Sequence, residues 1–404
     1  MATDDSPHVH VPEQTTLTIS DPTDVIAAVP YLLGFHPTDS IVILGIRACA
    51  THVRCLLRCD LTDELAEHAA EWAGQLAATL AEAGCGSVIA VGYGSARHIT
   101  PCVDALRARA PAVGVPVREA LRVSDGRYWS YVCDSTECCP HDGVAYDVAT
   151  SAVPATAVVG GLSVWRDRGV IEEFVAAVNG HRRAQMERAT LDAEERAARM
   201  RHRLLPSGEA ALRAAVRSEG VRVVRAAVGA ALRGDLVDAP ERIAWLGLLL
   251  GSIRVRDEAW ARIDTAHLDT HVGLWRQVFR HVRADYSAAP GSLLAFAAWQ
   301  SGDIALADVV LDRVEEAAPH YTMAALLRRA VRGGMPPERW EPMTPEWLEE
   351  VAPLRGSAVP LPASDPTVPK RPIAPTDPET THGPEEAAGR PDGPATDGGE
   401  ANPP

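Results

Sequence analysis

Apolar and polar positions follow two different periods along this chain, and the change of period marks its organisation. Up to about residue 165, short apolar runs typical of strands alternate with stretches in which apolar residues recur at helical spacing. From about residue 166 onward, only the helical period recurs. The pattern predicts an α/β class N-terminal domain with a mixed sheet, followed by an all-α helical bundle.

The clearest local prediction concerns the first helix and the strand that follows it. Asp21 can cap a helix, and Gly34 suits the left-handed residue that follows a helix end. A turn then leads into residues 41–46, which are apolar on both faces as in a buried strand. Because nearly every residue of this segment has a structural role, only His36 and Asp39 are left as candidate ligand-binding residues.

Further elements of the first domain follow from the same reasoning. We expect strands at 52–60, 87–91, 115–123 and 127–132, a helix capped by Thr62, and another that begins at Thr100-Pro101. Asp125-Gly126 is a strong signal for a two-residue hairpin turn, which places Arg122 opposite Trp129. This pair either holds a small anionic or planar ligand or forms an ordinary cross-strand cation–π contact.

A glycine pair at Gly92 and Gly94 follows the predicted strand 87–91, as phosphate-binding loops follow strands. The next helix is expected only several residues later, and no Gly-Lys-Ser/Thr sequence is present. The pattern therefore favours a flexible turn over a nucleotide site.

Three cysteines form the strongest candidate for chemistry. Cys133, Cys138 and Cys139 lie in a loop after a strand, and clustered thiolates can bind zinc. Their spacing is not that of a zinc knuckle, so a fourth ligand has to come from His141 or from elsewhere. Zinc binding, a reactive thiol and ordinary packing all stay open at this point.

Several motifs together resemble a known family. They are the segments 30–40 and 91–94, the run 125–131 followed by the three cysteines and Pro140, and the segment 298–303. On these motifs the chain resembles domain-of-unknown-function family 4192, a bacterial group without an assigned activity, over roughly residues 17 to 340. The resemblance implies membership of a family and supplies no catalytic residue.

Charge and hydropathy narrow the choice of partner and compartment. The net charge of −15 and the pI near 5.4 argue against nucleic acid as a partner. The N-terminus lacks the layout of a signal peptide, and the longest nearly apolar run, 243–253, is too short to span a membrane. We expect a cytoplasmic protein without a membrane association, in which the cysteines are mostly reduced.

The helical part and the tail complete the predicted organisation. Leu294, Gly302 and Pro319 sit at offsets similar to those of a tetratricopeptide helical hairpin, so we expect a bundle with tetratricopeptide-like packing. The tail has 12 prolines from residue 360 to the end and almost no large apolar residue, which predicts disorder. The predicted divisions are a flexible N-terminus (1–16), the α/β domain (17–165), a charged connecting helix (166–205), the helical domain (206–354) and the disordered tail (355–404).

Two functions from different classes remain. The first is a non-catalytic binding or regulatory module that presents its surface to a protein partner, favoured because no catalytic motif is found. The second is a small-molecule-binding protein or enzyme with a pocket near His36, Trp129 and the loop of Cys133, Cys138 and Cys139, with zinc as its cofactor. Convergence of these residues on one cavity would favour the second function.

Overall fold

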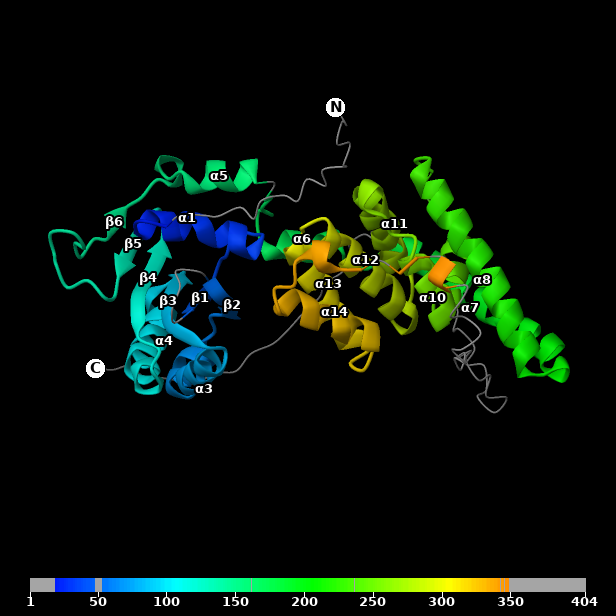
Figure 1. Cartoon of the computed structure of the whole chain (residues 1–404), viewed down its shortest axis with the longest axis horizontal. Helices are drawn as coiled ribbons and strands as arrows, with labels where there is room; N and C mark the ends of the chain where they lie inside the picture. Colours follow the sequence, from blue (N-terminus) through cyan, green and yellow to red (C-terminus); the bar gives the residue numbers. More distant parts are fainter. Residues whose placement is uncertain are drawn as a thin grey trace, which may run out of the picture. The chain divides into compact units, whose positions relative to one another are not determined.

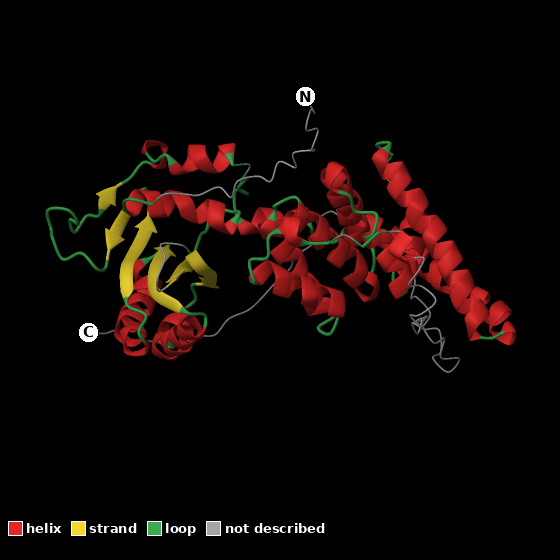
Figure 2. Ribbon diagram, viewed as in Figure 1, coloured by secondary structure: helices red, strands yellow, loops and turns green. Residues whose placement is uncertain are grey.

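A computed structural model of the protein describes residues 19–47, 53–160, 162–235, 237–341, 343–344 and 346–348. A mixed sheet occupies the N-terminal part, and the chain that follows it is mostly helical (Figure 2). The predicted α/β class with a following helical region is therefore confirmed. The predicted N-terminal segment 1–16 and the tail 355–404 lie outside the described residues.

Six strands form one sheet in the order β2-β1-β3-β4-β5-β6. Their bounds are β1 Ser40–Arg47, β2 Val53–Asp60, β3 Cys85–Tyr93, β4 Val117–Ser124, β5 Arg127–Ser130 and β6 Val144–Ala145. Strands β3 and β4 pair in parallel, and the other neighbouring pairs are antiparallel. The β3–β4 connection contains a helix because parallel neighbours need a crossover.

Helices cover both faces of the sheet (Figure 1). On one face lie α2 (Asp63–Glu67), α3 (Ala69–Glu82) and α4 (Ala96–Arg109), and on the other lies α1 (Pro22–Leu33) with α5 (Val153–Val159) packed on it. Strand β1 is buried almost throughout because both of its faces are covered, which explains its continuous apolar run.

The predicted ends of α1 are confirmed. The Asp21 carboxylate accepts a hydrogen bond of 3.0 Å from the backbone N–H of Asp24. Gly34 follows the helix with φ 79°, the left-handed conformation that glycine adopts without a steric cost. Asp21 and Gly34 therefore set where α1 begins and where it ends.

Two helices differ from the prediction, one in its start and the other, whose Thr62 cap is confirmed, in its continuity. The helix expected at Thr100-Pro101 begins at Ala96, and Pro101 lies inside it. Burial of Ile99 and Cys102 against the sheet offsets the backbone hydrogen bond that the proline removes. The helix capped by Thr62 is interrupted at His68, which divides it into α2 and α3.

The helical region shares one continuous core, which includes the fully buried Trp275 and Trp299. Its helices are α6 Arg168–Phe174, α7 Gly180–Leu204, α8 Glu209–Leu232, α9 Pro240–Leu249, α10 Ile253–Trp260, α11 Leu268–His281, α12 Ala288–Gln300, α13 Ile304–Ala317 and α14 Thr322–Arg332. Helices α12 and α13 form a tight hairpin whose turn contains Gly302 at φ 83°. Among the described residues, no helix combines the length and the apolar character needed to cross a bilayer.

Candidate metal centre

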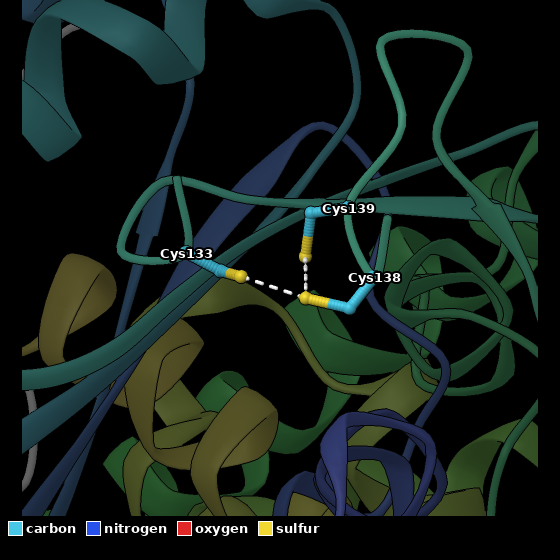
Figure 3. A group of neighbouring side chains, drawn as sticks. All are labelled: Cys133, Cys138 and Cys139. Atoms are coloured by element: carbon cyan, nitrogen blue, oxygen red, sulfur yellow. Dashed lines mark hydrogen bonds between the residues drawn. The ribbon is translucent and has the colours of Figure 1, made fainter. Parts of the chain in front are cut away.

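Three thiol groups converge in the loop between β5 and β6 (Figure 3). The Sγ atoms of Cys133 and Cys138 are 2.9 Å apart, and those of Cys138 and Cys139 are 3.7 Å apart. All three sulfurs lie within 4.8 Å of one another. Zinc–sulfur bonds of about 2.3 Å in a tetrahedron place thiolates roughly 3.8 Å apart. The sulfurs of Cys138 and Cys139 already have this separation, and those of Cys133 and Cys138 have to move apart by roughly 1 Å to admit zinc.

Hydrogen bonds at the end of β5 fix the entry to the loop. The Ser130 hydroxyl accepts hydrogen bonds from the backbone N–H groups of Val132 (3.2 Å) and Cys133 (3.1 Å). The same hydroxyl donates to Glu119 Oε1 on β4 over 2.8 Å. Ser130 thus holds the backbone of Cys133 to the sheet. The Glu119 carboxylate on the neighbouring strand orients the Ser130 hydroxyl.

Trp129 and Arg127 of β5 anchor the exit of the loop. The indole Nε1 of Trp129 donates to the carbonyl of His141 (3.0 Å), and Arg127 Nη1 donates to the carbonyl of Gly143 (2.8 Å). A Cβ at Gly143 would lie 2.5 Å from the Trp129 ring, so this approach requires glycine. The strand side chains therefore determine the path of the loop.

Cys133 and Cys139 differ in their acidity. A hydrogen bond with Cys138 lowers the pKa of Cys133. Burial, followed by the neighbouring thiols, raises the pKa of Cys139 to about 12. Because the thiols interact, ionisation of one disfavours ionisation of the next. A bound divalent cation would offset the repulsion between the ionised thiols, since it binds the thiolate form of each cysteine.

The predicted Arg122–Trp129 pair is formed beside this loop. Hairpin register pairs the two residues, and the guanidinium carbon of Arg122 lies 3.5 Å from the centre of the Trp129 ring. The charge of Arg122 also opposes the rise that burial causes in the pKa of Tyr131. The ring nitrogens of His141 are not part of the group of three sulfurs in the described structure. The backbone carbonyl of His141 accepts the hydrogen bond from Trp129.

His36 and Asp39 lie elsewhere on the sheet. Both are exposed, and neither side chain makes a hydrogen bond or ion pair with Arg122, Trp129 or the cysteines among the described residues. Asp39 precedes β1, and two strands separate β1 from β5, or roughly 14 Å at about 4.8 Å per strand. The candidates thus divide into the thiol loop with its adjoining Arg–Trp pair, and a separate strand entry.

A sequence model of the domain of unknown function DUF4192 matches residues 22–338. The chain belongs to this family. No curated protein and no solved structure matches it. The DUF4192 match begins at the first residue of α1 and spans the sheet, the thiol loop and helices α6 to α14.

The glycine pair of this DUF4192 chain is placed differently from the expectation, because α4 begins directly after Gly94 and Ser95. Ile99 fills the space over Gly92, where a Cβ would lie 2.6 Å from it. A Cβ at Gly94 would lie 3.2 Å from the Asp39 carboxylate. A negative side chain at a helix N-terminus opposes a phosphate there, so the geometry favours a turn.

A second sulfur pair in the DUF4192 fold was not predicted. Cys55 and Cys59 pack against the core, and Cys55 Sγ lies 3.5 Å from Cys85 Sγ. Gly45 permits this contact, since a Cβ there would lie within 2.6 Å of both sulfurs. Burial raises the pKa of Cys55 to about 11, which keeps it a packed thiol rather than a ligand.

Proposed function

We propose that this DUF4192 protein is a non-catalytic binding module whose α/β domain carries a zinc ion held by Cys133, Cys138 and Cys139. The observation that carries the proposal is the convergence of the three Sγ atoms within 4.8 Å. Thiolate ligands select zinc among the common divalent ions, and a cytoplasmic location keeps the thiols reduced.

His141 is the fourth ligand that we propose. It follows Cys139 after a single intervening residue and is the histidine nearest to the three cysteines in sequence. Three cysteines and one histidine make a closed site, which stabilises a fold instead of activating water. The loop needs such support because it lies between β5 and the very short β6.

In this proposal, the helical region binds the protein partner. Its α12–α13 hairpin supports tetratricopeptide-like packing, in which helical hairpins present a shared surface. The zinc centre then acts as a stabilising element of the α/β domain, and the helices supply the contact with a protein partner.

A second function is a small-molecule-binding protein or enzyme in which the fourth zinc position is open. One observation favours it: the Arg122–Trp129 pair adjoins the thiol loop through the His141 carbonyl. Against it, one face of the Arg122 guanidinium is already covered by the Trp129 ring, which leaves less of the guanidinium for a ligand.

Elemental analysis of protein purified under reducing conditions without chelators tests the zinc centre. We expect close to one zinc per chain, and cobalt substitution should give the visible spectrum of a tetrahedral thiolate site. Cys133→Ser and Cys138→Ser should each abolish zinc binding. Cys59 is a half-buried thiol of the core, so the Cys59→Ser variant should still bind zinc.

The fourth ligand is tested in the same assay. His141→Ala should weaken cobalt binding and shift its spectrum, whereas retention of the wild-type spectrum would assign the fourth position to water or a small molecule. Titration of free thiols verifies that Cys133 and Cys138 are reduced. Reduced protein that takes up neither zinc nor cobalt would refute the proposed metal centre.

A further inference from the structure

A groove of about 470 Å³ lies between the end of α13 and helix α14. Leu311 of α13 and Ala324 of α14 are buried beneath it, and Pro319 of the connecting turn forms one side. The lining therefore offers an apolar floor of the size that accepts one or two side chains of a peptide.

Arginine side chains surround this floor. Arg328 is 10% exposed, and its Nη1 and Nε bind Asp312 (2.8 Å) and Glu315 (3.1 Å). Its remaining nitrogen, Nη2, is buried without a hydrogen-bond partner. A buried guanidinium nitrogen without an acceptor is costly, so an incoming acceptor at this position would be stabilised.

Arg329 and Arg332 carry the exposed positive charge of the groove. Within the described residues, neither side chain forms a hydrogen bond or an ion pair. Arg332 interacts with Asp308 only through longer-range electrostatic attraction. Elsewhere in the helical region, Arg225, Arg254 and Arg262 each form an ion pair with the buried Glu258. Two arginines without an ion pair among the described residues therefore lie beside the apolar floor.

The chain after α14 turns toward other helices. Trp340 stacks on Trp260 of α10 with ring centres 5.3 Å apart, and Gln300 of α12 hydrogen-bonds the carbonyl of Pro337. Leu326, on the outer side of α14, is 62% exposed. The segment 337–340 thus packs on the core and leaves the outer side of α14 exposed.

We propose that the α13–α14 groove binds a short acidic segment of a partner protein. Carboxylates of the segment pair with Arg329 and Arg332, and its apolar side chains fill the floor over Leu311 and Ala324. Charge complementarity selects this partner: carboxylates alternating with apolar residues match both the cations and the floor. Glu315 on the rim disfavours a continuous polyanion such as nucleic acid. This inference specifies the partner of the proposed binding module and does not depend on zinc.

Fluorescence anisotropy with the full chain tests the groove. The probe is a short fluorescein-labelled peptide of alternating glutamate and leucine, compared with a lysine–leucine peptide, a glutamate–serine peptide and single-stranded DNA of similar length. We expect binding of the glutamate–leucine peptide alone, weakened by added salt because exposed charges are screened. Absence of binding, or tighter binding of the DNA, would overturn the proposal.

Charge reversal supplies the matched variants. Arg329→Glu combined with Arg332→Glu should weaken peptide binding at least tenfold. The control combines Arg203→Glu with Arg217→Glu, which changes the net charge equally at exposed residues of α7 and α8. Equal binding by both double variants would overturn the groove assignment. Cys133→Ser should retain peptide binding even if it loses zinc, so failure of the zinc centre and failure of the groove are distinguishable.

Discussion

The indole Nε1 of Trp165 donates a hydrogen bond of 2.9 Å to Oδ2 of Asp303. The backbone of Trp165 pairs with the segment after α1, because its N–H donates to the Gly34 carbonyl (2.8 Å) and its carbonyl accepts from His36 (3.1 Å). Asp303 in turn caps α13 by accepting from the N–H of Leu306 (3.0 Å). Trp165 therefore links two of the family motifs, 30–40 and 298–303, which are far apart in sequence.

A double-mutant cycle should detect this link. Trp165→Phe removes the donor and retains the ring contact with Phe174, and Asp303→Ala removes both acceptor oxygens. We expect Trp165→Phe to cost about 1 kcal/mol and Asp303→Ala about 1–3 kcal/mol of unfolding free energy. The coupling energy should be about 1 kcal/mol, measured by denaturant unfolding. Strict additivity of the two substitutions would show that the hydrogen bond contributes nothing.

Gly34 should resist substitution for two separate reasons. Its φ is 79°, and a Cβ there would lie 2.8 Å from Cβ of Ala305. Gly34→Ala should destabilise the fold by roughly 1–3 kcal/mol. Ala305→Gly should destabilise the Gly34→Ala variant less than it destabilises the wild type, since it relieves the contact and leaves the backbone strain.

Gly74 provides the matched control for this substitution. It lies inside α3, and a Cβ there has no atom within 4 Å. Gly74→Ala should therefore stabilise the protein by about 0.5–1 kcal/mol. Similar melting temperatures for the two alanine variants would contradict the assigned role of Gly34.

Trp129 should influence metal binding without being a ligand. Trp129→Phe loses the hydrogen bond to the His141 carbonyl and weakens the packing over Gly143. Because groups that support metal ligands commonly contribute about tenfold or more in affinity, we expect cobalt to bind about tenfold more weakly. Trp72→Phe, a change in α3 outside the loop, should leave cobalt affinity unaltered.

His271 should make stability depend on mildly acidic pH. Its side chain is 1% exposed, and burial lowers its pKa, with Asp264 opposing and His267 assisting this shift. Above about pH 6.5 the imidazole is neutral in both the folded and the unfolded state. Below that pH the unfolded chain takes up a proton first, so stability falls until the folded pKa is reached.

Comparison of the wild type with His271→Gln isolates this contribution. His281, whose pKa burial also lowers, and the carboxylates affect both proteins alike and cancel. Wild-type protein should lose more unfolding free energy than His271→Gln between about pH 7.5 and pH 5.5. Equal losses would mean that His271 is protonated in the folded state.

Part of the candidate site was predictable because it depends on adjacent residues. Asp125 and Gly126 adopt φ 51° and 71°, the values of a two-residue hairpin turn, and that turn alone sets Arg122 opposite Trp129. The clustering of the three sulfurs also follows from one short loop. By contrast, whether His36 approaches this loop depends on strand order, which places two strands between β5 and β1, the strand that follows His36.

The sequence by itself determined the elements, the cap and glycine end of α1, and the hairpin beside the thiol loop, because these depend on residues only a few positions apart. Tertiary structure decided that α4 begins at Ala96 despite Pro101, and that Cys55 meets Cys85. It also decided that Trp165 reaches Asp303. Such contacts depend on how whole faces pack together, and hydrophobic periodicity shows that a face is buried without showing what covers it.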